Sequence, residues 1–68
     1  GGGGAVIRVD LDGAAVTSLD LDDARTLAEA LDMATSALAS GIADSPPRER
    51  IVTVRWHDGR RASRRFTA

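Results

Sequence analysis

Alternation of apolar and polar residues predicts two β-hairpins in this chain, one near each end. In the first, over residues 5–19, Ile7, Val9 and Leu11 share one face. The dipeptide Asp12-Gly13 follows, and it is favoured in two-residue type I′ turns because glycine accepts a positive φ. The turn length and the apolar pattern agree on one register, which pairs Leu11 with Ala14, Val9 with Val16 and Ile7 with Ser18.

The second hairpin is predicted over residues 51–67, where Val52, Val54 and Trp56 alternate with polar residues. A three-residue loop over residues 57–59, with Gly59 in the left-handed region, puts Ala62 and Phe66 on the same apolar face. A two-residue loop would put arginines there instead, so we favour the longer loop. The opposite face then displays Thr53, Arg55, Arg61, Ser63, Arg65 and Thr67.

A helix is predicted between the hairpins, with Asp20 as its N-cap and Gly41 as a left-handed stop. No glycine or proline interrupts residues 21–40. Apolar residues at helical spacing form one stripe: Ala24, Leu27, Ala28, Leu31, Ala34 and Leu38. The following segment, Ile42–Arg50, contains two prolines and is therefore a connection.

These elements predict an α+β fold of the β-β-α-β-β type, in which one helix packs on one face of an antiparallel sheet. Residues 5–68 form a single domain, and Gly1–Gly4 is a flexible leader or a cloning remnant. A chain of this size buries only about 60% of its unfolded surface, so its core is small. The predicted core comprises Val9, Val16, Leu27, Leu31, Val54, Trp56 and Phe66.

Composition excludes several classes of protein. With 43% apolar and 28% charged residues, the chain is globular rather than disordered. It has no cysteine, which excludes disulfides and thiolate metal sites. No apolar run approaches the roughly 20 residues of a membrane span, and no signal-peptide pattern is present. We therefore expect a cytoplasmic protein with no membrane partner.

Charge is distributed unevenly along the chain. Residues 1–44 carry two arginines against seven aspartates and one glutamate, a net charge of −6. Residues 45–68 carry seven arginines against one aspartate and one glutamate, a net charge of +5. Such a division is typical of a nucleic-acid-binding surface, and equally of two halves that attract each other.

Few residues are arranged for catalysis or metal binding. His57-Asp58 is the one pair of catalytic type, but these neighbours lie in a predicted turn and no serine is placed as a nucleophile. The aspartates near the first turn and the helix start lack the spacing of a calcium loop, and capping explains them better. We expect no enzymatic activity, no metal or other cofactor and no small-molecule substrate.

The arginine-rich second hairpin is the strongest functional signal. Arg55, Arg61 and Arg65 share the face opposite the core, and Arg60 and Arg64 lie nearby. Guanidinium groups bind phosphates bidentately, and a two-stranded ribbon fits a major groove. The two aromatic residues fall on the core face, which disfavours binding of single strands by stacking. In the alternative interpretation, this face is solvated and neutralises the acidic half.

A second apolar strip predicts a homodimer. It consists of Ala30, Met33 and Ala37 on the helix, and Val6 and Leu19 add apolar surface on the outer side of the first hairpin. Domains below roughly 70–80 residues that lack disulfides and metals often gain stability by pairing. The first expectation for function is therefore a non-enzymatic interaction or dimerisation module. The second is a DNA- or RNA-binding accessory protein that uses the arginine-rich hairpin.

Part of the chain resembles known families. Residues 11–38 include the text LDGAAVTSLDLDDARTLAEAL. This segment is similar to small uncharacterised actinobacterial and actinophage proteins that combine a β-hairpin with an "EARALAEAL"-type helix, and that resemblance implies no known activity. It also resembles the amino-terminal dimerisation domain of the mycobacterial histone-like, AT-DNA-bridging nucleoid proteins, which implies dimerisation. The DNA-binding tail of the nucleoid family, with its Arg-Gly-Arg hook, has no counterpart here.

Overall fold

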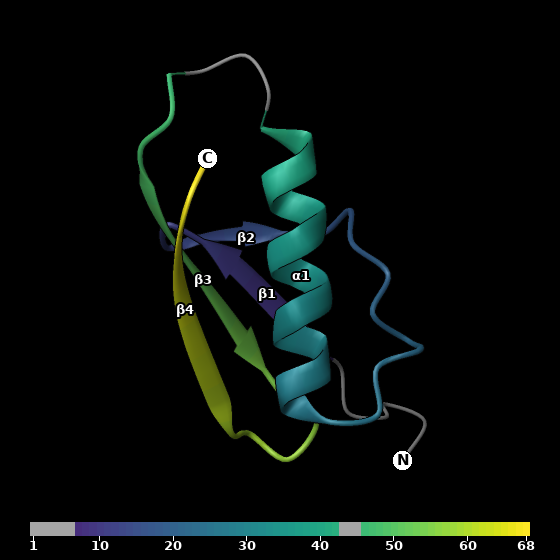
Figure 1. Ribbon diagram of the computed structural model, residues 1–68. Coiled ribbons are helices and arrows are strands. Elements are labelled where there is room, and N and C mark those ends of the chain that lie inside the picture. Colours follow the sequence, from purple (N-terminus) through teal and green to yellow (C-terminus); the bar gives the residue numbers. More distant parts are fainter. Residues whose placement is uncertain (1–6, 43–45) are drawn as a thin grey trace.

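Four strands and one helix make up the part of the chain that the computed structural model describes, residues 7–42 and 46–68 (Figure 1). In chain order they are β1 (Arg8–Leu11), β2 (Ala14–Val16), α1 (Leu27–Gly41), β3 (Glu49–Arg55) and β4 (Arg61–Thr67). The strands form one antiparallel sheet in the order β2-β1-β3-β4. Helix α1 lies across one face of this sheet, which confirms the predicted β-β-α-β-β fold (Figure 1).

The first hairpin has the predicted turn and register. Asp12 has φ 51° and Gly13 has φ 85°, and positive values at both central residues define a type I′ turn. Leu11 pairs with Ala14 and Val9 pairs with Val16. The β1–β2 ladder ends at that second pair, so the expected third pair, Ile7 with Ser18, is not part of it.

The second hairpin is also confirmed, including its three-residue loop. Gly59 has φ 92°, and the Trp56 N–H donates to the Arg60 carbonyl at 2.7 Å across the loop. Val54 pairs with Ala62 and Arg50 pairs with Phe66. Because side chains alternate along a strand, Ala62 and Phe66 face the helix together with Val52 and Val54, as the pattern predicts.

The predicted start of the helix is wrong by six residues. Helix α1 begins at Leu27, and the Thr26 hydroxyl oxygen caps it by accepting the N–H of Glu29 at 3.1 Å. The Asp20 carboxylate instead accepts the N–H of Asp22 at 3.0 Å. Aspartate competes with the helix by forming such local bonds, so the aspartate-rich segment remains a turn. Leu21 from that segment nevertheless reaches the core.

The predicted left-handed stop at Gly41 is also wrong. Gly41 is the last residue of α1, and its φ is not positive. The chain leaves the helix at Ile42, whose N–H still donates to the Leu38 carbonyl at 3.2 Å. This i→i−4 bond is of the helical type, and Ile42 has φ −100°, so the helix ends without a left-handed residue.

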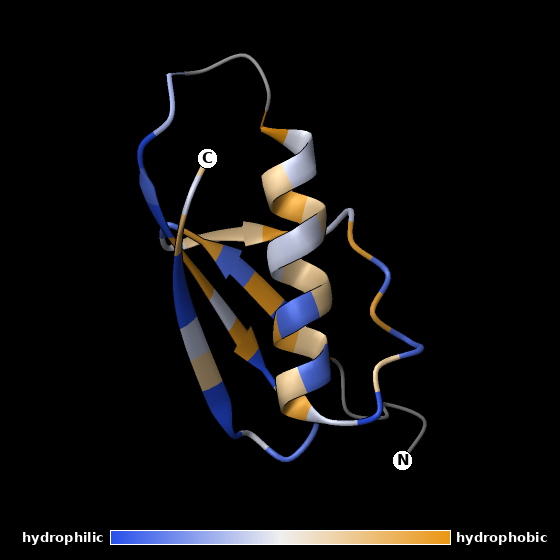
Figure 2. Ribbon diagram, in the orientation of Figure 1, coloured by the Kyte–Doolittle hydropathy of each residue, from blue (hydrophilic) through white to orange (hydrophobic). Residues whose placement is uncertain are grey.

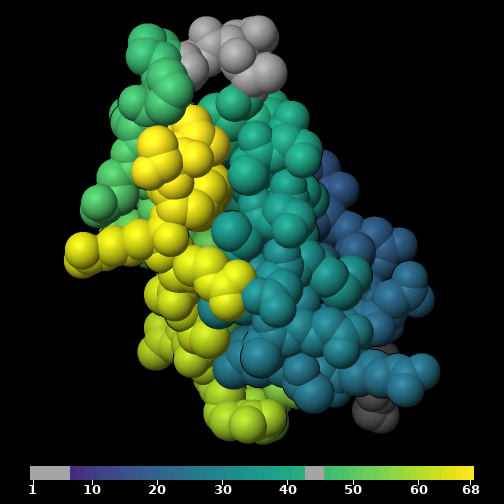
Figure 3. Space-filling view, viewed as in Figure 1, coloured from purple at the N-terminus to yellow at the C-terminus, as the bar shows by residue number. Residues whose placement is uncertain are grey.

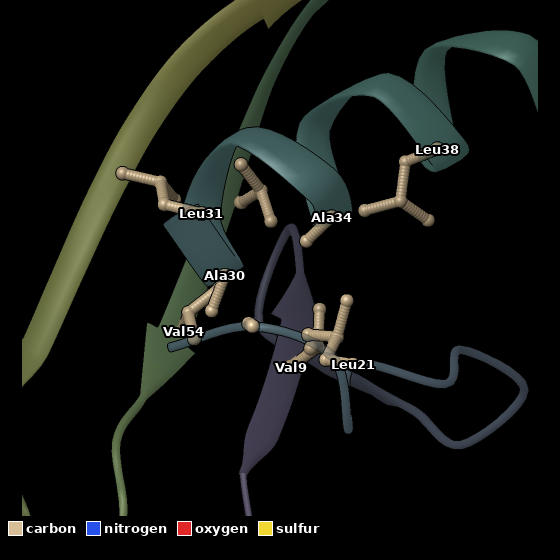
Figure 4. Close-up of a cluster of buried hydrophobic side chains, with 9 residues drawn as sticks. Val9, Leu21, Ala30, Leu31, Ala34, Leu38 and Val54 are labelled. Atoms are coloured by element: carbon tan, nitrogen blue, oxygen red, sulfur yellow. The ribbon is translucent and has the colours of Figure 1, made fainter. Parts of the chain in front are cut away.

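The core lies between α1 and the sheet, and small residues dominate it on the helix side. Ala30 and Ala34 have no exposed surface (Figure 4). Because their side chains are small, the helix backbone can approach the sheet closely at these two positions. The buried hydrophobic residues of the described chain are Val9, Leu21, Ala24, Ala30, Leu31, Ala34, Leu38, Val52 and Val54. Of the predicted core, Val16, Leu27, Trp56 and Phe66 are only half-buried and pack around this cluster.

The core is one helix wide, so the larger apolar residues remain at its border. Hydrophilic residues dominate the outermost strand β4, whereas apolar residues recur along α1 and β3 (Figure 2). Within the described residues, no helix is long and apolar enough to cross a membrane.

Candidate functional site

The sheet face opposite α1, here called the open face, carries most of the polar hairpin residues. Register and alternation place eleven residues there: Arg8, Asp10, Ala15, Glu49, Ile51, Thr53, Arg55, Arg61, Ser63, Arg65 and Thr67. All of them are exposed or half-buried. This placement confirms the polar face predicted from the second hairpin, and it adds residues from β1 and β2.

Three arginines form a line across one end of the open face, next to the loop of the second hairpin. Arg8 in β1 is the register partner of Arg55 in β3, and Arg55 is the partner of Arg61 in β4. We call these three residues the arginine row. Directly opposite residues have Cβ atoms about 4.5–5.5 Å apart, and like charges at that spacing destabilise a sheet. The fold therefore concentrates three positive charges where they repel each other.

The arginine row is only partly neutralised. The Arg8 Nε lies 3.3 Å from an oxygen of Asp10. Neither Arg55 nor Arg61 has a hydrogen bond or an ion pair through its side chain with any residue in the described part of the chain. The guanidinium groups of Arg55 and Arg61 are therefore without an acidic partner among the described residues.

Hydroxyl groups and a fourth arginine extend the same surface. The hydroxyls of Thr53 and Ser63 are 2.9 Å apart, two residues further along the strands from the row. Arg65 follows on β4, and its Nε lies 3.9 Å from a carboxylate oxygen of Glu49. Both of these side chains are largely exposed, so solvent weakens their attraction. Arg65 therefore remains accessible to an anion.

Two of the predicted site residues lie away from the open face. Arg64 faces the helix, and its Nη1 pairs with an oxygen of Asp32 on α1. Arg60 lies in the turn, where its Nε is 2.6 Å from an oxygen of Asp58. The Arg60 N–H also donates to the Asp58 carboxylate, and this bond, together with the guanidinium, lowers the pKa of Asp58. Arg60 and Arg64 thus have acidic partners within the chain.

Arg50 has a structural role that the sequence reasoning missed. It is only 8% exposed, and its Nη1 lies 3.1 Å from an oxygen of Asp12. The Asp12 carboxylate also accepts the N–H of Ile51 at 3.0 Å, and this bond, followed by the Arg50 contact, lowers the pKa of Asp12. The turn of the first hairpin is thereby attached to β3. The sequence does indicate this role, because Arg50 precedes Val52 and Val54 at two-residue spacing and therefore lies on the same, core-facing side of the strand.

Among the described residues, ion pairs join the acidic and basic halves at two points, Arg50 with Asp12 and Arg64 with Asp32. Asp10 and Glu49 share the open face with the arginines, whereas three further aspartates lie elsewhere. Asp20, Asp22 and Asp23 belong to the segment that places Leu21 and Ala24 in the core, on the helix side of the sheet. No arginine of the described residues forms an ion pair with any of these three.

The predicted dimer residues do not form one surface. Ala30 is completely buried in the core of its own chain, so its assignment to an interface is wrong. Met33 is half-buried and Ala37 exposed, and both line a shallow hollow on α1. Leu19 is half-buried beside β2, and Val6 lies outside the described residues. For Leu19, Met33 and Ala37 a role in dimerisation stays a prediction.

Further features of the described residues are a hollow on the surface and the pair His57-Asp58. An open groove of about 720 Å³ lies beside β2 and is lined by Ile7, Val16 and Leu19 together with Asp20 and Asp22. His57 packs edge-on against Trp56, with ring centroids 4.6 Å apart, while Asp58 holds the turn. In residues 7–42 and 46–68, no three histidine, cysteine or acidic residues lie close enough to share a metal ion.

Comparison with known proteins adds no relative. Searches with protein-family models, among curated proteins and among solved structures each find no match to this chain. The arrangement of residues on the open face is therefore the basis for a functional proposal.

Proposed function

We propose that the open face binds the phosphate backbone of a nucleic acid. The observation that supports this proposal is the arginine row, in which Arg55 and Arg61 lie side by side without an acidic partner among the described residues. In the free protein these charges repel each other. A polyanion across the row replaces the repulsion by attraction and releases its own bound counterions. Binding is thus favoured by two separate electrostatic terms.

The chemistry of the face favours contact with the backbone and not with bases. Guanidinium groups bind phosphate oxygens bidentately, and the hydroxyls of Thr53 and Ser63 beside the row can donate to them. Trp56 and Phe66 face the helix side, so neither of these two rings is placed on the open face for a base to stack on. We therefore expect binding that depends weakly on sequence.

The dimerisation module expected first from the sequence has less support on the helix. With Ala30 buried, the apolar strip on α1 is reduced to Met33 and Ala37, which share their hollow with Asp32, Ser36 and Ser40. Such a small and mixed surface is well below the area that stable interfaces bury. A role in association must therefore use another part of the molecule.

Duplex binding measured by fluorescence anisotropy at increasing salt tests the proposal. Contacts from the row and Arg65 to three or four phosphates predict a log–log slope of about −3 to −4. The double change Arg55→Ala and Arg61→Ala should reduce the magnitude of that slope by about 2 and weaken two unrelated duplexes equally.

A matched control removes two arginines elsewhere. Arg25→Ala with Arg60→Ala makes the same change in net charge but leaves the open face intact. This control should keep most of the wild-type slope. Absence of duplex binding by the wild-type protein, or an equal loss in the control, would show that the open face does not bind a backbone.

A further inference from the structure

We infer that a second copy of this chain pairs with the outer edge of β4, so that two sheets join into one. Strand β4 is the last strand in the sheet order, and β3 is its only neighbouring strand among the described residues. It is seven residues long and lies along the outer side of the molecule beside α1 (Figures 1 and 3). A long strand with one free edge offers a row of backbone groups to another strand.

The hydrogen bonds of β3 with β4 identify the groups at the free edge. Arg48 and Ala68 exchange both backbone bonds, at 3.3 and 3.1 Å, and the Trp56 N–H donates to Arg60 at the other end of the ladder. In an antiparallel ladder, the residues that bond to the neighbour recur at every second position. The even-numbered residues of β4 therefore bond to β3. The N–H and C=O groups that point outward belong to Arg61, Ser63, Arg65 and Thr67.

A second copy suits this edge because a two-fold axis pairs the strand with itself in the antiparallel direction. The outward groups of one copy then meet the same outward groups of the other. Three registers use most of the strand, and they centre the axis on Ser63, Arg64 or Arg65. The side chains of the open face distinguish between them.

Charge on the open face favours the register centred on Arg64. An axis at Ser63 would put Arg61 opposite the partner's Arg65, and an axis at Arg65 would put that residue opposite its own copy. Like charges directly opposite each other are unfavourable. With the axis at Arg64, Arg61 lies opposite the partner's Thr67 and Ser63 lies opposite the partner's Arg65. No two arginines are then directly opposite on the open face.

Contacts on the helix side agree with the same register. Phe66 is half-buried at the border of the core, and it lies opposite the partner's Ala62, which covers part of its exposed surface. Arg64 meets its own copy at the axis, but each Arg64 is already paired with Asp32 of its own helix. Because the axis is perpendicular to the sheet, both open faces lie on the same side of the joined sheet.

Sedimentation of the isolated protein over a range of concentrations tests this pairing, and nucleic acid is absent so that the result is independent of the proposed function. Thr67→Arg is the informative variant. Within its own chain, residue 67 lies opposite Glu49, so the new arginine favours the monomer fold. In the dimer it lies opposite the partner's Arg61. Two such contacts per dimer should weaken association on the order of tenfold.

A charge exchange tests the register itself. Adding Arg61→Glu to Thr67→Arg should restore association, because each new arginine then lies opposite a glutamate of the other copy. Thr17→Arg is the matched control; it adds the same charge at an exposed position after β2 and should leave association unchanged. A wild-type protein that stays monomeric at high concentration contradicts the inference. So does a dimer that Thr67→Arg and Thr17→Arg affect equally, which would indicate another interface.

Amide hydrogen exchange in the wild-type protein provides a second measurement that needs no variant. The outward N–H groups of Arg61, Ser63, Arg65 and Thr67 should exchange quickly at low concentration and become protected as the dimer forms. The N–H groups of Ala62 and Arg64 bond to β3 and should be protected at both concentrations. Outward groups that stay unprotected in a dimeric sample would exclude pairing through β4.

Discussion

Under the proposed function, Arg55 strengthens binding of a polyanion but lowers the stability of the fold. It lies between Arg8 and Arg61 in the arginine row, with a like charge directly opposite on each side. Replacing it with threonine removes both repulsions and keeps a residue that suits a strand. We therefore predict that Arg55→Thr stabilises the fold while it weakens binding of a duplex.

The gain in stability from Arg55→Thr follows from the two contacts of Arg55, with Arg8 and with Arg61. A like-charge pair directly opposite on a sheet changes stability by about 0.2–1 kcal/mol, so two pairs give roughly 0.4–2 kcal/mol. Arg8 already pairs with Asp10, so the contact with Arg61 contributes the larger share. In a domain of this size, about 1 kcal/mol corresponds to a shift in Tm of roughly 4–8 °C. The Debye length falls from about 10 Å at 0.1 M salt to about 3 Å at 1 M, so high salt should remove most of the gain.

Urea unfolding followed by circular dichroism, at low salt and at 1 M salt, measures this effect. Arg65→Thr is the matched control, because it removes an arginine from the same face that lies outside the row and near Glu49. Arg65→Thr should therefore not increase the free energy of unfolding. If Arg55→Thr destabilised the protein, if its gain were the same at both salt concentrations, or if Arg65→Thr gave an equal gain, the repulsion in the row would not be what limits stability.

Three further predictions concern the fold. Leu31→Ala removes a buried side chain of the core and should cost about 2–5 kcal/mol in urea unfolding. Thr26→Ala removes the helix cap and should cost about 1 kcal/mol, whereas Asp20→Ala should leave helix content unchanged in circular dichroism. The pKa of Asp12 is lower in the folded than in the unfolded chain, so its contribution to stability is present above about pH 4 and lost as the pH falls through the folded value. The difference in Tm between the wild type and Asp12→Asn should therefore shrink on acidification.

The two hairpins could be predicted because local signals agree. In each, an Asp-Gly dipeptide fixes the position of the turn, and the apolar alternation on either side accepts one register. The helix start was mispredicted because two N-cap signals compete. Asp20 precedes the apolar stripe, but Thr26 with Glu29 three residues later has the spacing of a capping box. The aspartates between these two positions favour local turns, which decides in favour of Thr26.

The arginine row could be predicted only in part. Alternation within the second hairpin places Arg55 and Arg61 together, and the sequence indicates as much. Arg8 joins them because β1 pairs with β3 at a register that relates residues 47 positions apart in the chain. No local pattern encodes that register. The pairing of Arg64 with Asp32 likewise depends on how α1 crosses the sheet, so sequence alone could not separate paired arginines from unpaired ones.

The fold divides the arginines between two environments, and this division argues against simple neutralisation. Arg50 and Arg64, which face the helix side, each reach an acid from the first half of the chain. If balancing charge were the only requirement, the aspartates that precede the helix would lie beside Arg55 and Arg61 as well. Instead, Asp20, Asp22 and Asp23 lie in the segment that packs on the opposite side of the sheet. A surface that binds a polyanion needs this separation, since acids beside the row would repel the ligand. Without acids beside Arg55 and Arg61, the repulsion within the arginine row lowers the stability of the free protein. The Arg55→Thr experiment measures the size of that repulsion.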